Sequence, residues 1–76
     1  MTEGTLTKNE NSRWEFAHVE LTSGDAVEVH VGQWIEGRIE HDGKDYVLLV
    51  GEQCVTIRLQ AGMQARLPQQ ARPRYR

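Results

Sequence analysis

Apolar and polar residues alternate along most of the chain between Trp14 and Leu67. Alternation over about four to eight residues is typical of a β-strand with one buried face. No window repeats apolar residues at the spacing of an amphipathic helix, and turn-forming stretches such as Thr-Ser-Gly-Asp and Asp-Gly-Lys-Asp interrupt the alternation. The pattern therefore predicts strands over residues 14–21, 26–31, 34–41, 54–59 and 63–67. The continuous apolar run over residues 46–50 predicts a further strand with apolar residues on both faces.

The same alternation predicts which side chains point inward. In segment 34–41, Ile35 and Ile39 share one face, and Trp34 shares the other with two glutamates and an arginine. Because unpaired charges are costly to bury, the isoleucine face is predicted to point inward and Trp34 outward. The other predicted inward positions are Val27, Val29, Val31, Gly37, Val55, Ile57, Leu59, Met63, Ala65 and Leu67.

Short strands joined by tight turns predict an antiparallel sheet. Gly32-Gln33 is predicted to form a two-residue hairpin turn, and Asp42-Gly43 begins the strongest turn signal of the chain. Closure of so small a sheet would remove its exposed edges. The predicted fold is all-β: a small antiparallel, five- to six-stranded SH3-like barrel over residues 13–68.

The two ends of the chain differ in composition from this segment. Residues 1–12 are mainly polar with one leucine, so a flexible N-terminal lead is predicted. Pro68 cannot donate to a strand ladder and should end the last strand. Residues 69–76 are then expected to form a basic C-terminal tail.

Composition and charge limit the class of protein. The chain has 76 residues, a formal net charge of −2 and a single cysteine, Cys54, which excludes an intramolecular disulfide. We expect one small cytoplasmic domain, without a signal peptide or membrane span, for which homodimerisation would add buried area. Residues 1–52 carry all eleven acids and four basic residues, whereas residues 53–76 carry five arginines and no acid.

The order Gly-Asp-Ala-Val-Glu-Val, Trp-Ile-Glu-Gly-Arg-Ile, Tyr-Val-Leu-Leu-Val, Val-Thr-Ile-Arg-Leu and Gly-Met-Gln-Ala-Arg-Leu resembles SH3-like barrels of the Tudor and KOW type. The Trp-x-x-Gly-Arg-Ile-Glu run, with the Gly-Met-x-x-Arg-Leu ending, also resembles a domain of unknown function found in small bacterial and mobile-element proteins. The resemblance covers residues 14–68. It implies the barrel and an origin on a mobile element, but no partner, because barrels of this type serve many functions.

The sequence offers no metal or catalytic site. His18, His30 and His41 lie on three separate predicted strands without the spacing of metal ligands. Cys54 has no base near it in the sequence, and the paired acids Glu36 and Glu40 lie on an exposed strand face. We therefore expect no cofactor, no metal and no enzymatic activity.

Binding is the remaining class of function. The candidate binding residues are Trp34, Arg38, Tyr46, Arg58 and Arg66. An exposed tryptophan among arginines and glutamates has the composition of a protein interface, so a protein partner is expected first. The structural alternative is that Trp34 covers only the rim of the barrel.

Two further functions stay open. Nucleic acid could bind the same face together with the tail arginines Arg72, Arg74 and Arg76. The glutamates of this face and a calculated isoelectric point of about 5.9 weigh against that function. The acidic half of the chain is also compatible with a mobile-element inhibitor of a host defence system.

Overall fold

The computed structural model describes residues 2–52 and 55–68, which contain strands and no helix. The predicted all-β class is confirmed. No helix in this part of the chain could cross a membrane. The strands are β1 (Glu3–Thr5), β2 (Thr7–Lys8), β3 (Trp14–Phe16), β4 (Val19–Glu20), β5 (Ala26–His30), β6 (Trp34–His41), β7 (Tyr46–Val50), β8 (Val55–Arg58) and β9 (Gln64–Arg66).

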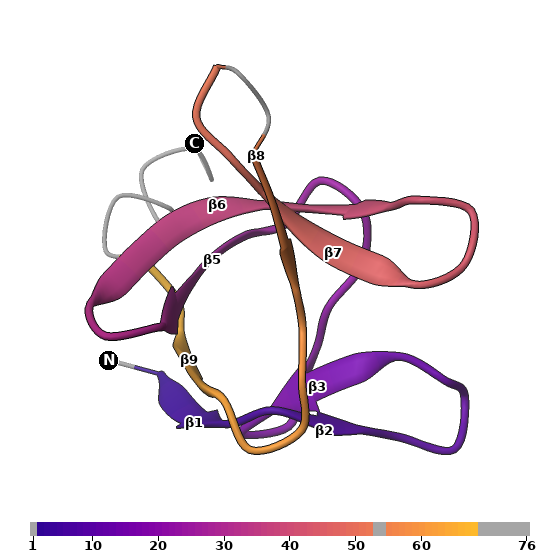
Figure 1. Cartoon of the computed structure of the whole chain (residues 1–76). Helices are drawn as coiled ribbons and strands as arrows, with labels where there is room; N and C mark the ends of the chain where they lie inside the picture. Colours follow the sequence, from indigo (N-terminus) through magenta and orange to yellow (C-terminus); the bar gives the residue numbers. More distant parts are fainter. Residues whose placement is uncertain (1, 53–54, 69–76) are drawn as a thin grey trace, which may run out of the picture.

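The strands form two antiparallel sheets (Figure 1). The larger sheet has the order β1-β9-β5-β6-β7-β8, and the smaller has the order β2-β3-β4. Strands β5 to β8 follow one another as a meander, and β9 returns to pair with β5. Strand β1 then pairs with the other side of β9, so the first and last described strands lie side by side.

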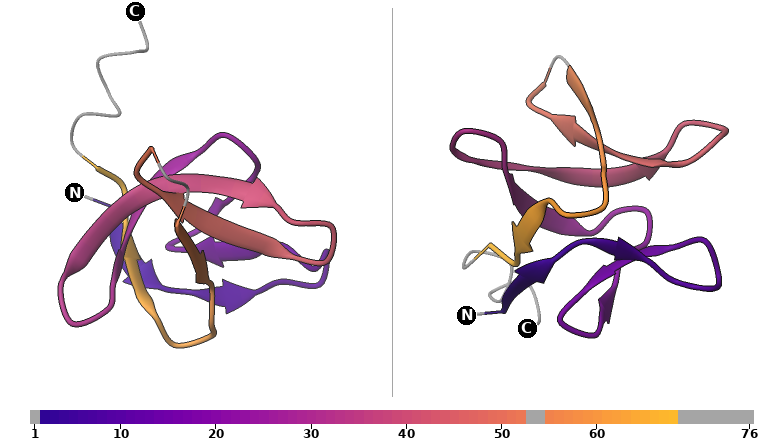
Figure 2. Two further views of the ribbon diagram at one scale, coloured as in Figure 1. Left: turned by 45° about the horizontal axis from the view of Figure 1, so that its top comes forward. Right: turned by 60° about the horizontal axis from the view of Figure 1, so that its bottom comes forward.

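The core lies between the two sheets, with β6 and β7 on one side and β2 and β3 on the other (Figure 1, Figure 2). Alternate residues of the large sheet point into it, and Leu6 and Phe16 fill it from the opposite side. The fully buried large side chains are Phe16, Leu6, Leu21, Ile39, Leu48, Val27 and Val29. The predicted inward face of segment 34–41 is confirmed at Ile39, which is 0% exposed.

Gly37 allows β6 and β7 to approach closely at the core. A Cβ atom at this position would lie 2.5 Å from the carbonyl oxygen of Leu49 and 2.8 Å from Cγ of Leu48. Both distances are shorter than any normal carbon contact, so a larger residue would force the strands apart. The Gly-Arg-Ile motif in β6 is thus explained by packing.

The N-terminal segment is part of the fold rather than a flexible lead over residues 1–12. Strand β1 pairs with β9, the Leu6 N–H donates to the Met63 carbonyl, and the Leu6 side chain is 0% exposed. The prediction rested on the low apolar content of the segment. Backbone pairing to a distant strand provides the stabilisation, and composition does not reveal it.

Segment 14–21 is a hairpin, not one strand. Strands β3 and β4 pair with Phe16 opposite Val19, and the two residues between them, Ala17 and His18, have φ of +49° and +67°. Two central residues with positive φ characterise the hairpin turn that suits twisted strands, usually built from asparagine and glycine. The sequence has alanine and histidine at these two positions, so it does not predict this turn.

The predicted closed barrel is not observed among the described residues, since β1 and β8 remain at the ends of the large sheet. The chain leaving β8 turns directly into β9, which pairs with β1 and β5 instead of β8. Two predicted inward valines are exposed: Val31, in the loop after β5, at 45%, and Val55, at the start of β8, at 57%. The hairpin after β5 also has three loop residues rather than two, because His30 is opposite Trp34.

Candidate functional site

Three of the five candidate binding residues lie on the outer face, by which we mean the side of β5, β6, β7 and β9 that points away from the core. Opposite residues of paired strands share a face. Arg66 of β9 is opposite Glu28 of β5, and Glu28 is opposite Glu36 of β6. Trp34 and Arg38 lie on the same side of β6 as Glu36, as the alternation predicted.

Trp34 and Arg66 are brought together on this face. The guanidinium carbon of Arg66 lies 4.0 Å from the centre of the indole ring, and its Nε donates to the Glu28 carboxylate. The ring of His30 meets Trp34 edge-on at 5.1 Å. A cation over an aromatic ring contributes about 0.5–2 kcal/mol. The tryptophan is therefore half-buried and held in place rather than freely projecting.

Arg38 borders a hollow in the same face. The hollow has a volume of about 550 Å³ and lies over the start of β5, the middle of β6 and the end of β7. Five of the seven residues that line it are glycine, alanine or leucine, and Glu36 and Arg38 contribute opposite charges. The lining residues are Gly24, Ala26, Glu36, Gly37, Arg38, Leu49 and Gly51. Arg38 Nε lies 2.6 Å from Glu40 Oε2, so this arginine is already paired.

Tyr46 does not join this group, and Arg58 lies at its border. Arg58 of β8 is opposite Val47 of β7, which is opposite Glu40 of β6, so Arg58 is on the same side of the sheet as Arg38 but two strands away from it. Tyr46 lies opposite His41 and packs against the core cluster, on the side of β7 that faces the small sheet. The tail arginines Arg72, Arg74 and Arg76, like Cys54, lie outside the described residues.

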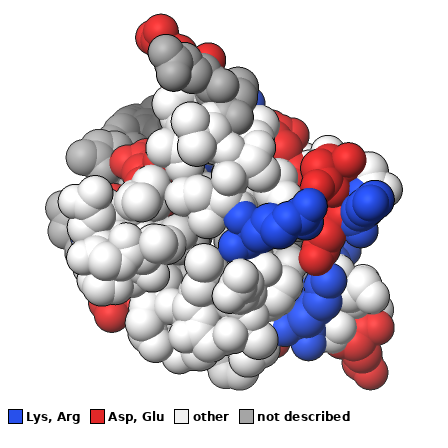
Figure 3. Space-filling model, viewed as in Figure 1, with Lys and Arg blue, Asp and Glu red and all other residues white. Residues whose placement is uncertain are grey.

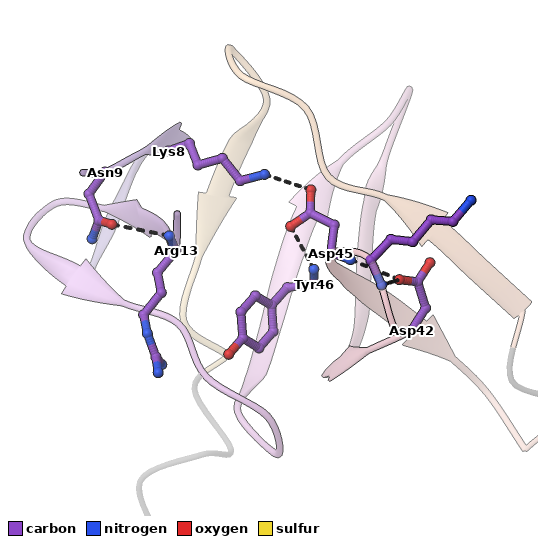
Figure 4. Close-up of polar contacts among 7 residues, drawn as sticks. Lys8, Asn9, Arg13, Asp42, Asp45 and Tyr46 are labelled. Atoms are coloured by element: carbon purple, nitrogen blue, oxygen red, sulfur yellow. Dashed lines mark hydrogen bonds and ion pairs between the residues drawn. The ribbon is translucent and has the colours of Figure 1, made fainter. Parts of the chain in front are cut away.

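Tyr46 instead belongs to a polar seam between the two sheets (Figure 4). The Lys8 ammonium of β2 lies 2.8 Å from the Asp45 carboxylate, and Arg13 lies 5.8 Å from the centre of the Tyr46 ring. Asn9 Oδ1 accepts from the Arg13 N–H and so orders the loop after β2. The seam joins β2 and its loop to the turn between β6 and β7.

Asp45 is the central acceptor of this seam. The hydrogen bond from Lys8 is the main cause that lowers the pKa of Asp45, against the opposing effect of partial burial. The Trp14 indole N–H is buried and has no hydrogen bond within the described part of the chain. It nevertheless lies near enough to the Asp45 carboxylate to contribute to the lowered pKa. Asp45 thus connects the large sheet with β2 of the small sheet through its ion pair with Lys8.

The neighbouring Asp42 orders the turn itself. Its Oδ1 accepts from the backbone N–H groups of Asp45 and Lys44, and these two hydrogen bonds lower the pKa of Asp42. His41 Nδ1 accepts from the Gly43 N–H, whose residue has φ of +97°. The predicted turn at Asp42-Gly43 is therefore confirmed, with side-chain acceptors that fix its shape.

Acidic residues outnumber basic residues in the described part of the chain, eleven to six. Figure 3 shows basic and acidic side chains interleaved at the side where the turn between β6 and β7 lies, while much of the remaining visible face is uncharged. Three of the six basic residues, Lys8, Arg38 and Arg66, are in ion pairs. Across residues 2–52 and 55–68, no group of three histidine, cysteine or acidic residues is placed to hold a metal ion.

Sequence reasoning missed the residues that hold the candidate side chains. Glu28 could be predicted as outward, but its partner Arg66 lies 38 residues away on a strand whose neighbour was unknown. Lys8 lies in the segment predicted to be a flexible lead, so the sequence does not predict its ion pair with Asp45. Alternation predicts the face of a residue, whereas only strand order decides which residues of that face meet.

The comparisons with known proteins identify the family. A family model described as a domain of unknown function, DUF5348, matches residues 4–67. This match covers more than four fifths of the chain, so the protein belongs to that family. No curated protein and no solved structure matches the chain significantly.

Proposed function

We propose that this member of the DUF5348 family is a small non-enzymatic protein-binding module that uses the outer face of β5, β6 and β7. The hollow over Ala26, Gly37 and Leu49 carries the proposal. Small and apolar residues next to charged ones let a protein interface combine burial of an anchoring side chain with polar specificity. Trp34, fixed by Arg66, forms one end of this face.

The charges beside the hollow indicate the chemistry of the partner. Glu36 is exposed on one side of the hollow, whereas Arg38 on the other side is already paired with Glu40. Within residues 2–52 and 55–68, the charge beside the hollow that is not in an ion pair is therefore the negative charge of Glu36. A partner that inserts a short aliphatic side chain next to a lysine or arginine would complement both the small and apolar lining residues and Glu36.

The ion pairs weigh against nucleic acid as the ligand of this face. A phosphate backbone is bound mainly by lysine and arginine side chains that can release counterions. Arg38 and Arg66 would each have to leave a carboxylate first, and Glu28, Glu36 and Glu40 would repel the phosphates. The nucleic-acid alternative consequently depends on residues outside the described part of the chain.

We also retain the SH3-like barrel as a proposal for the fold. The meander of β5 to β8, followed by the return of β9 to β5, supports it. Strands β1 to β4 would then be an N-terminal addition, with β1 and β2 forming one chain segment that changes sheet at the buried Leu6.

The test is a titration of the isotope-labelled full chain with peptides selected on it from a random displayed library. We expect the backbone amide signals of Gly24, Ala26, Gly37 and Leu49 to shift most. Ala26→Tyr fills the hollow and should weaken binding at least about tenfold, which corresponds to about 1.4 kcal/mol. Thr7→Tyr, at an exposed strand position outside the face, is the control and should bind as the unmodified chain does.

Two outcomes would contradict the proposal. Shifts confined to another surface, or equal binding by Ala26→Tyr, would remove the hollow as the binding site. Signals of Arg38 and Arg66 that shift with a short DNA duplex at low salt, and return at high salt, would favour the nucleic-acid alternative instead.

A further inference from the structure

The two sheets end in edge strands that differ sharply in length and composition. Strands β2 and β4 have two residues each, and β1 has three. Strand β8 has four residues, Val55 to Arg58, of which three in succession are β-branched and none is acidic or proline. Within the described residues, β7 is the only strand that pairs with β8.

An unpaired edge exposes a row of backbone N–H and C=O groups that can accept a further strand. Proteins usually limit this by keeping edge strands very short or by placing lysine or proline in them. The edges β1, β2 and β4 follow this rule through their shortness. Strand β8 is longer and rich in residues that favour strands, so it is the edge of this fold best suited to accept one.

The side chains at the two ends of β8 add specificity. At its start, Val55 is 57% exposed and borders a hollow of about 490 Å³ that Val50, Gly51 and Glu52 complete. At its end, Arg58 is exposed and, unlike Arg38 and Arg66, forms no ion pair within the described residues. Figure 1 shows β8 crossing the front of the molecule between the hairpin tip and the turn into β9.

We propose that β8 binds an extended segment of a partner protein as an added antiparallel strand. Backbone hydrogen bonds would supply affinity, and the side chains opposite Val55 and Arg58 would supply specificity. This surface is separate from the hollow over Ala26 and does not depend on the function proposed for it. The antiparallel direction follows the pairing of every strand in the sheet.

The register predicts the sequence of the partner segment. Alternate residues of β8 point to opposite sides, with Val55 and Ile57 on one side and Thr56 and Arg58 on the other. An acidic residue opposite Arg58 would be followed by an aliphatic residue opposite Ile57, a residue opposite Thr56 and an aliphatic residue opposite Val55. The predicted motif is acid, aliphatic, any residue, aliphatic.

A second copy of the chain is a poorer occupant of this edge. In a pair of β8 strands, each Arg58 would face a residue of the partner β8 or of its immediate flanks. The strand contains no acid, and Glu52, three residues before it, would come opposite Arg58 only if the two Val55 residues were opposite each other, a register that leaves most of each β8 unpaired with the other. The cation would then remain without the complementary charge that a partner segment can supply.

The experiment titrates the labelled full chain with a blocked peptide that carries a central Glu-Val-Thr-Val sequence. We expect saturable shifts of the amide signals of Val55, Thr56, Ile57 and Arg58, and slower hydrogen exchange of those amides that form new bonds. A peptide with the same side chains but alternate backbone nitrogens methylated is the control and should not bind. Shifts that do not saturate, or equal binding of the methylated peptide, would overturn the proposal.

Charge reversal tests the register. Arg58→Glu should weaken binding of the peptide about fivefold, the size expected for an exposed ion pair turned into a repulsion, and a Lys-Val-Thr-Val peptide should recover it. Lys44→Glu is the matched control, because Lys44 is exposed but lies outside β8, and it should change neither peptide. Equal effects of Arg58→Glu on both peptides would contradict the register.

Two further results separate the alternatives. Ala26→Tyr should leave this binding unchanged, so loss of the hollow and loss of the edge can be told apart. Concentration-dependent dimerisation that protects the β8 amides in the absence of peptide would assign the edge to a second copy and overturn the proposal.

Discussion

At the scale of single residues, the tightest constraint in the molecule is Gly37 and the most informative contact is that of Trp34. Gly37 is needed because a neighbouring strand passes too close for any side chain. Trp34 is outward as its alternation predicts, yet Arg66 covers its ring. Both residues belong to the same eight-residue strand, β6, where packing and binding requirements therefore meet.

Gly37→Ala is expected to destabilise the protein by about 1–3 kcal/mol, since the added carbon would clash with the Leu49 carbonyl and the Leu48 side chain. Urea unfolding followed by circular dichroism measures the effect. Glu36→Ala, at the adjacent exposed position, should stay within about 0.5 kcal/mol. Equal stability of Gly37→Ala and the unmodified chain would show that β6 and β7 can separate without cost.

Trp34→Ala is expected to lower the free energy of unfolding by about 1–2 kcal/mol, because it removes the surface on which Arg66 and His30 pack. Chemical denaturation gives this value, and Gln33→Ala in the adjoining loop serves as the control. A full loss of peptide binding with no change in stability would instead identify Trp34 as a contact residue alone. A loss of stability with unchanged binding would identify it as cover for the sheet.

At the scale of elements, the hairpin of β3 and β4 is the least regular part of the fold. Ala17 and His18 occupy a left-handed conformation that glycine or asparagine adopts at lower cost. The hairpin is nevertheless held in place by Phe16, which is 1% exposed, and by the Leu21 N–H, which donates to the Trp14 carbonyl. Tertiary packing thus imposes a turn that the local sequence does not favour.

His18→Gly should stabilise the protein by about 0.4–1 kcal/mol, because relief of the unfavourable φ outweighs the added freedom of the unfolded chain. The melting temperature reports the change. Ser23→Gly, in an exposed turn without positive φ at that residue, adds the same freedom without the relief and should be neutral or destabilising. A lower melting temperature for His18→Gly would show that the imidazole makes a contribution larger than the strain.

At the scale of the whole molecule, two sheets share one core and are joined at a polar seam. Lys8 and Asp45 connect them across 37 positions of sequence. The pKa of Asp45 is lowered below its ordinary value of 3.8, chiefly by Lys8. A lowered pKa in the folded state means that the charged carboxylate stabilises the fold above pH 3.8, and that this stabilisation is lost as the pH falls through the lower, folded value.

Asp45→Asn is therefore expected to cost about 0.2–1 kcal/mol at neutral pH, as for other exposed ion pairs, and progressively less below pH 3.8. Melting temperatures from pH 7 down to pH 2 measure the difference. Lys8→Met should remove the same part of the acid dependence, and the double variant should lose no more than either single variant. Additive losses would show that the two side chains act independently.

Much of the fold could be predicted from the sequence. The all-β class follows from alternation, and the bounds of β6 and β7 coincide with the predicted segments 34–41 and 46–50. Strand β6 alternates regularly, β7 is a short apolar run, and the turn residues Asp42 and Gly43 lie between them, so the local sequence is enough to predict both. Strand β1 and the division of segment 14–21 could not be predicted, because pairing with distant strands decides both.

The candidate site, too, could be predicted only in part from the sequence. Trp34, Arg38, Arg58 and Arg66 were predicted to point outward, and the strand register places them on one side of the large sheet, with Arg58 two strands away from Arg38. The side of Tyr46 could not be predicted, because its strand has apolar residues on both faces. The sequence by itself determined which side of each strand a residue occupies, because successive side chains must point in opposite directions. Only the tertiary structure decided which strands are neighbours, which charges pair and which edge remains open, because those depend on the order in which the chain returns to the sheet.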